Sequence, residues 1–206
     1  MARAGLSHDI VVAEAAAVAD EIGWERLNLA LIAERLGVKL PSLYKHIASL
    51  DGLRRDLAVI GTRELADVLS ASAVGRARTD ALHAVAKAYR RFALEHPGRY
   101  AATVRAPASD DLEHGEAADS VLRIVFAVLA GYGLAGDDVI DATRSLRAGL
   151  HGFVALEAGG GFAIARDVES SFNRLIEAFD SAFASWANSI YGSPASVARE
   201  HVEWPK

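Results

Sequence analysis

Residues 28–53 contain two short stretches with helical apolar spacing, separated by a single glycine, and this arrangement restricts the local fold more than any other part of the chain. The first stretch follows Asn28, whose side chain can accept hydrogen bonds from unpaired N–H groups at a helix start. Its apolar residues recur every three or four positions: Leu29, Ile32, Ala33 and Leu36. Gly37 follows, and glycine adopts a left-handed conformation without a Cβ penalty. The pattern predicts a helix that ends in a sharp reversal.

A second short helix is predicted from Leu40 to Ile47. Pro41 would lie in its first turn, where a missing N–H costs nothing, and Leu43 would face inward one turn before Ile47. The other side chains are expected to face outward or to lie at the rim, namely Lys39, Ser42, Tyr44, Lys45 and His46.

The outward face of this helix pair is expected to be cationic. No Asp or Glu occurs between Arg35 and Leu50, whereas Arg35, Lys39 and Lys45 are positive. Such a face attracts phosphates, although the formal net charge of the chain is −5. The net acidity argues only against a protein that coats nucleic acid indiscriminately.

Two helices joined by a short glycine-containing turn form the helix-turn-helix motif, whose second helix lies in the major groove of DNA. Any helical hairpin in a bundle can share this spacing, so the spacing alone leaves both interpretations open. The residue identities go further, because they resemble the N-terminal domain of the TetR family of bacterial transcriptional regulators. The matching positions are Ile32-Ala33, Gly37-Val38, Leu43-Tyr44, His46, Ile47, Ser49 and Leu53.

The resemblance implies a homodimeric, ligand-responsive repressor that binds a palindromic operator in double-stranded DNA. It also implies phosphate contacts from Tyr44 and His46, to which we add Lys45, while Lys39 and Ser42 are expected to reach base edges. Asn28, at the start of the first helix, completes the candidate DNA-binding set.

The helix-turn-helix departs from the TetR pattern at two positions. Lys39 occupies a site where the family usually has Ser or Thr as a helix cap, and a lysine side chain cannot accept a hydrogen bond. Leu50 occupies a site where the family usually has a lysine close to the DNA backbone. One phosphate contact is therefore in doubt, and Lys39 is the candidate substitute.

The whole chain is predicted to be all-α, because alanine-rich helical patterns dominate and alternating β patterns are scarce. Three parts are expected: a helix-turn-helix domain over 1–50, a helical regulatory and dimerisation domain over 51–192, and a tail over 193–206. Besides the two helices above, we expect helices over 7–22, 49–70, 79–96, 97–105, 112–132, 137–157 and 167–191. Arg3 lies before them and is interpreted either as a solvated terminal arginine or as an arm that reaches DNA.

The last two long helices are the predicted dimer interface. Apolar residues recur along the final helix at Phe172, Leu175, Ile176, Phe179, Phe183, Trp186 and Ile190, a stripe wide enough for the core and a partner. A stripe that serves the core alone is the alternative. The TetR resemblance implies a four-helix dimer interface here. The segment 146–157 further resembles a TetR subgroup with a Trp-His-Gly element, although Leu150 replaces the tryptophan.

A pocket for an unknown small-molecule effector is expected in the regulatory domain, which mixes aromatic rings with a few polar groups. The candidate ligand-binding residues are Tyr89, Phe92, Tyr100, Arg105, Phe126, His151 and Phe153. Each has a plainer interpretation: the aromatics as core, Arg105 as a solvated cation, and His151 as a core histidine bonded to a carbonyl.

The sequence offers no catalytic or cofactor motif. The seven histidines show no pair at i, i+4 and no HExxH, and there is no cysteine, so no metal site is predicted. The Gly159–Gly161 run follows a helix instead of a strand and does not resemble a phosphate loop. We therefore expect no enzyme, no cofactor and no membrane span, and a cytoplasmic location. The alternatives are a helical ligand-binding or scaffold dimer that has lost DNA binding, and an all-α enzyme.

Overall fold

The computed structural model describes residues 5–186, and every regular element in this range is helical, which confirms the all-α prediction. Arg3, Ile190, Tyr191 and the predicted tail over 193–206 lie outside the described residues. The elements are α1 His8–Ile22, the 3₁₀ helix η1 Trp24–Arg26, α2 Leu29–Arg35, α3 Leu40–Leu43, α4 Leu50–Ala73, α5 Arg78–Glu95, α6 Pro97–Ala102, α7 Leu112–Ala130, α8 Gly136–Ala158 and α9 Val168–Trp186.

Side-chain caps determine where several helices begin. Ser7 accepts from the N–H of Ile10 at 3.3 Å, Asn28 from that of Leu31 at 3.0 Å, and Ser49 from that of Gly52 at 3.0 Å. Each bond satisfies one of the N–H groups that a helix start leaves without a partner. The starts predicted at these positions are confirmed.

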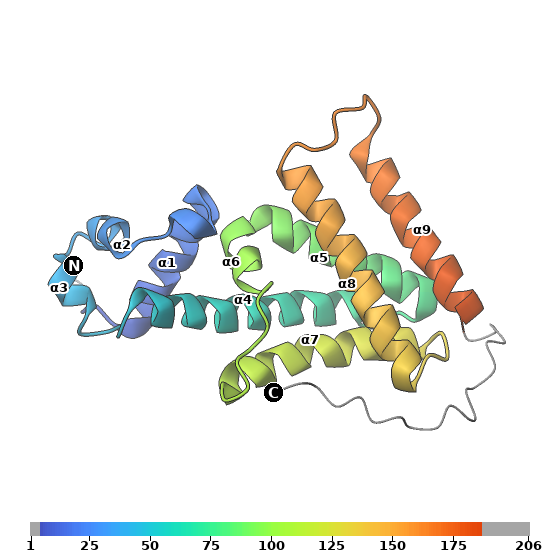
Figure 1. Ribbon diagram of the computed structural model, residues 1–206, viewed down its shortest axis with the longest axis horizontal. Helices are drawn as coiled ribbons and strands as arrows, with labels where there is room; N and C mark the ends of the chain where they lie inside the picture. Colours follow the sequence, from blue (N-terminus) through green and yellow to red (C-terminus); the bar gives the residue numbers. More distant parts are fainter. Residues whose placement is uncertain (1–4, 187–206) are drawn as a thin grey trace, which may run out of the picture.

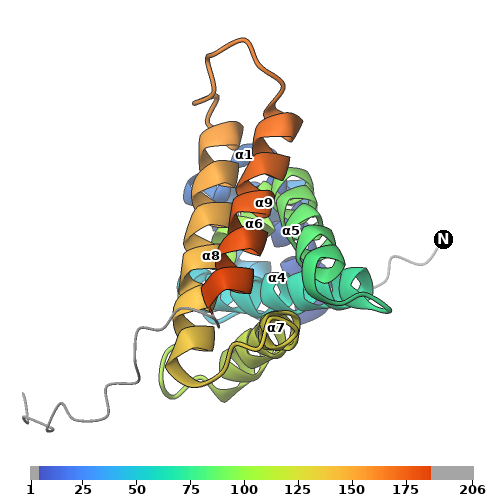
Figure 2. The same ribbon diagram turned by 90° about the vertical axis from the view of Figure 1, so that its right-hand side faces the viewer.

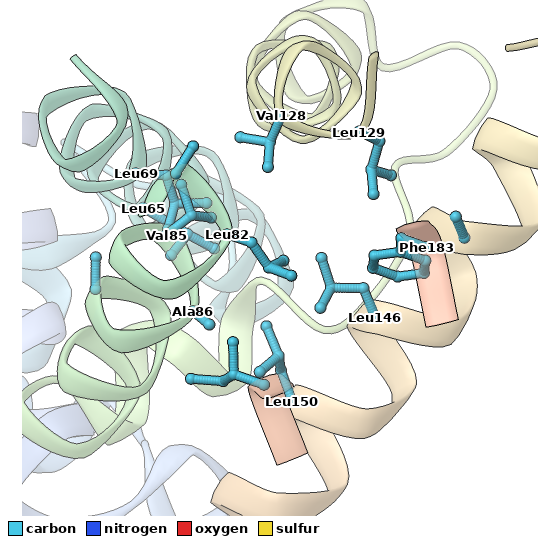
Figure 3. Close-up of a cluster of buried hydrophobic side chains, with 14 of the residues drawn as sticks. Leu65, Leu69, Leu82, Val85, Ala86, Val128, Leu129, Leu146, Leu150 and Phe183 are labelled. Carbon is cyan, nitrogen blue, oxygen red and sulfur yellow. The ribbon is translucent and has the colours of Figure 1, made fainter. Parts of the chain in front are cut away.

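Two hydrophobic cores lie along α4, the long helix that runs from the end holding α1, α2 and α3 into the end holding α5, α7, α8 and α9 (Figure 1). The first core joins α1, α2, α3 and the beginning of α4, with Leu53 and Leu57 fully buried, and takes Ala102 from α6. The second core joins the end of α4 to α5, α7, α8 and α9. Figure 3 shows its centre, where Leu82, Leu146, Leu150 and Phe183 converge. Since α4 contributes to both cores, the expected division at residue 50 falls at the first residue of a shared helix.

α3 is shorter than predicted, because it ends at Leu43 instead of Ile47. Lys39 precedes it and makes no side-chain cap, as its chemistry requires. Beyond the helix, the amides of His46 and Ile47 both donate to the carbonyl of Leu43, at 2.8 and 3.0 Å. One carbonyl therefore serves two amides, and the regular helical ladder stops there.

Several other boundaries also differ from the prediction, and two of them have an identifiable cause. α6 ends at Ala102 instead of residue 105, because the Thr103 hydroxyl and amide both bond to the Tyr100 carbonyl, at 2.8 and 3.0 Å, and close the chain into a turn. α5 begins at Arg78, which has a φ of +48°, and Thr79 does not cap it. The Thr79 hydroxyl instead donates to Asp180 on α9 at 2.7 Å.

Candidate DNA-binding surface and regulatory cluster

α3 lies at the end of the molecule remote from α8 and α9 (Figure 1). Leu43 and Ile47 are buried in the first core, as predicted, and Gly37 has a φ of +64°, which makes the reversal between α2 and α3 possible. Tyr44 is 54% exposed. Lys39 and Lys45 are also exposed, whereas Ser42 and His46 are half-buried at the rim. Within residues 5–186, no hydrogen bond or ion pair engages any of these five side chains, so they are available to an external partner.

Two residues near this surface have internal partners. Arg35, expected on the cationic face, points to α1 and pairs with Glu14 at 2.9 Å and Glu21 at 2.6 Å. This corrects the expected charge pattern, because two carboxylates neutralise that cation. Asn28 uses its oxygen to cap α2 and donates its amide to the Arg26 carbonyl at 3.1 Å. Leu50 is half-buried against the first core. The free cations of the surface are thus Lys39 and Lys45.

Three of the seven predicted ligand residues come together as a hydrogen-bonded chain, which we call the Tyr-Tyr-His cluster: Tyr89 on α5, Tyr100 on α6 and His151 on α8. The two hydroxyl oxygens are 2.8 Å apart, and the Tyr100 oxygen is 2.6 Å from Nδ1 of His151. Tyr100 is only 7% exposed. Burial raises the pKa of both phenols, so both stay protonated at neutral pH and can donate. His151 is bonded to a phenol, not to a carbonyl.

The sequence did not identify Arg147, one turn before His151 on α8. Its positive charge lowers the pKa of Tyr89 and of Tyr100, against the larger effect of burial. Its guanidinium donates to the carbonyl of Val104 at 3.1 Å. Arg147 is the cation beside the cluster, the place in which Arg105 was expected. Its position four residues before His151 on one helix was the available signal.

The other four predicted ligand residues are dispersed. Phe92 is buried in the second core and packs edge-on against His96. Phe153 lies between Phe162 and Phe172. Arg105 is exposed in the connection after α6, and Phe126 is exposed on α7, so neither joins the cluster. Two cavities, of about 560 and 430 Å³, are lined by none of the seven residues.

α6 carries the cluster's Tyr100 and also touches the first core. Arg99 contacts Asp20 of α1 and Glu64 of α4. Gly98 lies so close to α1 that a Cβ atom there would be 2.1 Å from the carbonyl carbon of Ala19. This short helix therefore connects the Tyr-Tyr-His cluster to the part of the chain that holds α3.

α8 and α9 lie side by side (Figure 2). Their close approach depends on Gly149, since a Cβ there would come within 2.5 Å of the Phe179 ring. The apolar stripe of α9 divides into two sets. Phe172, Ile176 and Phe183 are fully buried, whereas the half-buried members are Leu175, Phe179 and Trp186. Phe179 and Trp186 also pack against the second core, whereas Leu175 is not among the residues packed on it.

Among residues 5–186, no group of three or more His, Asp or Glu side chains is arranged to hold a metal ion. In the same range, no helix combines the length and apolar character needed to cross a bilayer.

Comparisons with known proteins identify the family. Residues 82–179 match the family described as "Tetracyclin repressor-like, C-terminal domain". The chain is 40% identical over 158 residues to the uncharacterized HTH-type transcriptional regulator Rv0681 of Mycobacterium tuberculosis, covering 76% of this chain and 72% of that protein. It is 35% identical to the uncharacterized HTH-type transcriptional regulator YobS of Bacillus subtilis, covering 86% of this chain and 92% of that protein.

The fold also resembles that of a TetR variant from Acinetobacter baumannii crystallised in complex with minocycline. The TM-score is 0.67 at 21% sequence identity, covering 90% of this chain and 100% of that one. Relatives and fold agree with the resemblance found in residues 32–53. The chain belongs to the TetR family of DNA-binding, helix-turn-helix transcriptional regulators, which are not enzymes.

Proposed function

We propose that this regulator is a cytoplasmic homodimeric repressor that binds a palindromic operator and releases it when a small-molecule effector binds the regulatory domain. The observation that carries the proposal is the α3 surface. It presents two unpaired lysines, a tyrosine, a serine and a histidine at one end of α4, and the other end of α4 is built into the second core.

In this proposal the segment from Lys39 to His46 enters a major groove. Tyr44, Lys45 and His46 contact phosphates, and Lys39 and Ser42 reach base edges. A one-turn helix is long enough for this task, because recognition helices read bases mainly through their first residues. Asn28 is assigned a capping role, since both polar atoms of its side chain have partners within the chain.

The dimer is proposed to form through α8 and α9. Leu175, Phe179 and Trp186 are half-buried on α9, and Leu156 on α8 is 53% exposed. Apolar side chains of this kind are enriched at the centre of interfaces between copies of a chain. A two-fold axis through this face would place one α3 surface on each subunit, which matches the two half-sites of a palindrome.

The effector response is proposed to act through the Tyr-Tyr-His cluster. Tyr89, Tyr100 and His151 come from three helices, and Tyr100 belongs to the helix that contacts α1. An effector that binds more tightly when this hydrogen-bonded chain is rearranged would shift the population away from the DNA-binding arrangement. DNA must then oppose effector binding by the same factor.

Fluorescence anisotropy tests DNA binding. The full chain is titrated into DNA from upstream of its own gene and into a scrambled control, over a range of salt concentrations. The proposal expects preference for the upstream DNA and affinity that falls steeply with salt. If equal, weak binding to both DNAs persists after selection from a random DNA library, the protein is a helical dimer that has lost DNA binding.

Sedimentation equilibrium tests the dimer. The wild-type chain is compared with Leu175→Glu, which places a charge on the half-buried side of α9, and with Glu177→Gln, an exposed substitution on the same helix. We expect a dimer for the wild type and Glu177→Gln, and a monomer for Leu175→Glu. A folded Leu175→Glu dimer would place the interface elsewhere.

A further inference from the structure

A groove of about 560 Å³ lies between the last turns of α4, the connection to α5, and α7. Small apolar side chains form most of its wall, including Ala66, Ala73, Val74, Ala81, Ile124 and Ala127. Four charged residues also line it: Arg76, Arg78, Arg123 and Asp67. The groove therefore carries a formal charge of +2, from three arginines and one aspartate, on a chain whose net charge is −5.

The three groove arginines differ from four other arginines of this protein. Arg35, Arg55, Arg90 and Arg99 each pair with two or more carboxylates. In the described part of the chain, no carboxylate lies within ion-pair distance of Arg76, Arg78 or Arg123. Arg76 donates to the Ser72 carbonyl and Arg123 to the Ser120 hydroxyl, each at 2.7 Å. These bonds orient the guanidinium groups but leave their charge uncompensated.

Contacts with Tyr132 and with α9 hold the backbone around Arg78, one of the arginines at the rim of the groove. Arg78 has a φ of +48°, which non-glycine residues rarely adopt, and its guanidinium lies 5.6 Å from the centroid of the Tyr132 ring. The next residue, Thr79, is bonded to Asp180 of α9 at 2.7 Å. Gly131, just after α7, lies close to this residue, since a Cβ there would lie 3.3 Å from the Arg78 nitrogen. The surrounding contacts thus fix an unfavourable backbone conformation.

We propose that this groove binds a small amphipathic carboxylate. The arginines at its rim supply charge-assisted hydrogen bonds for the carboxylate, and the alanine-rich wall accepts a short alkyl chain. The site is separate from the Tyr-Tyr-His cluster, because none of the cluster residues lines it. No residue of α8 or α9 lines it either, so a dimer through those helices leaves it accessible. The proposal does not depend on the proposed repressor activity.

Isothermal titration calorimetry of the full chain with octanoate tests this site. We expect saturable binding that weakens as salt increases, and none for acetate, which lacks the chain, or octanol, which lacks the charge. Arg123→Gln should weaken octanoate binding by about tenfold, the loss of one charge-assisted hydrogen bond. Asp67→Asn should strengthen it by about threefold, because a like charge is removed. Arg91→Gln, an exposed arginine outside the groove, should leave it unchanged.

A third substitution within the groove tests the apolar wall without a change of charge. Ala127 is exposed on α7 and lines the groove, so Ala127→Leu fills part of the chain-binding space and keeps a good helix former. We expect octanoate affinity to fall by about fivefold or more, while circular dichroism stays that of the wild type. Octanoate binding that responds to none of the groove substitutions, or no binding at all, would overturn the proposal.

Discussion

Arg99 on α6 donates twice to the carboxylate of Asp20 on α1, from its backbone N–H at 2.9 Å and from Nε at 2.7 Å. A third bond, from Nη1 to Glu64 on α4, measures 2.8 Å. The Asp20 side chain is 14% exposed and that of Arg99 is 22% exposed, so bulk water screens the pair only partly. Arg99 therefore ties α6 to α1, the helix that packs under the candidate DNA-binding surface.

Replacement of Arg99 by Ala should destabilise the fold. It leaves the enclosed Asp20 carboxylate without its cation, a loss of about 2 kcal/mol once partial solvent screening is allowed for. Urea unfolding followed by circular dichroism measures the change. Arg91→Ala, an exposed arginine on α5, should alter the free energy of unfolding by less than about 0.5 kcal/mol. Equal effects from both substitutions would mean that the contact with Asp20 contributes nothing.

Gly98→Ala should force α6 away from α1. The added Cβ would lie 2.1 Å from the Ala19 carbonyl carbon and 2.5 Å from the Asp20 nitrogen, both backbone atoms that cannot rotate aside. We expect a loss of about 3 kcal/mol in the free energy of unfolding. Gly115→Ala is the matched control, because its Cβ would meet nothing within 4 Å and α7 gains a better helix former. For that control the free energy of unfolding should rise by about 0.5 kcal/mol. An unchanged free energy of unfolding for Gly98→Ala would contradict the close packing of α6 on α1.

The stability of the protein should depend on the protonation of His114. This residue is 6% exposed, and burial lowers its pKa below the ordinary 6.5, with the charge of Arg55 acting in the same direction and that of Asp111 against it. A lowered pKa means that the unfolded chain takes up the proton first. The contribution is therefore complete above pH 6.5 and is lost as the pH falls from 6.5 through the lowered value. His114→Gln should remove this acid-side loss, because glutamine does not titrate.

His8 should behave in the opposite way and serves as the comparison. Its hydrogen bond to Asp56 raises its pKa above 6.5. Its contribution is complete below pH 6.5 and is lost as the pH rises through the raised value. Unfolding free energies measured across this range for His114→Gln and His8→Gln should deviate from the wild type with opposite signs. Parallel curves for the two variants would contradict the assignment.

Lys45→Ala should lower DNA affinity for every sequence and reduce the slope of log K against log salt concentration by about 1, as expected for one lost phosphate contact. Arg35→Gln should leave that slope unchanged, because Glu14 and Glu21 already neutralise Arg35. Ser42→Ala should instead alter sequence preference at similar salt dependence. Anisotropy titrations at several salt concentrations separate these outcomes, and an unchanged slope for Lys45→Ala would remove Lys45 from the phosphate contacts.

Local signals in the sequence predicted much of this fold. Ser7, Asn28 and Ser49 predict helix starts correctly. A capping side chain bonds to the amide three residues later, so the signal is local in the sequence. Asp167 does the same for α9, where it accepts from the Ser170 amide at 2.8 Å. The family resemblance likewise rests on a contiguous segment. The end of α3 was predicted wrongly. Two amides donate to the Leu43 carbonyl there, and no residue type in the sequence signals such a shared hydrogen bond.

The candidate sites were harder to predict, since they depend on partners far apart in the chain. Arg35 looked like a free cation until the fold brought Glu21 to it, and Arg105 was named as the pocket cation while Arg147 was not considered. Tyr89, Tyr100 and His151 were identified by residue type, but their order within one hydrogen-bonded chain follows from the packing of three helices. Phe126 has a residue type suited to a pocket, but the fold leaves its side chain exposed.

Because α4 is one continuous helix that contributes to both cores, a rotation at one of its ends displaces the other end. Its 24 residues extend about 36 Å, at the helical rise of 1.5 Å per residue. A tilt of only about 5°, pivoting where Leu65 and Leu69 are packed, would move the far end by about 2 Å. A small repacking of alanines and leucines near one end of α4 would thus displace the other end by a large fraction of the rise of one base pair. The size of this displacement depends on the stiffness of the helix more than on any chain of side-chain contacts.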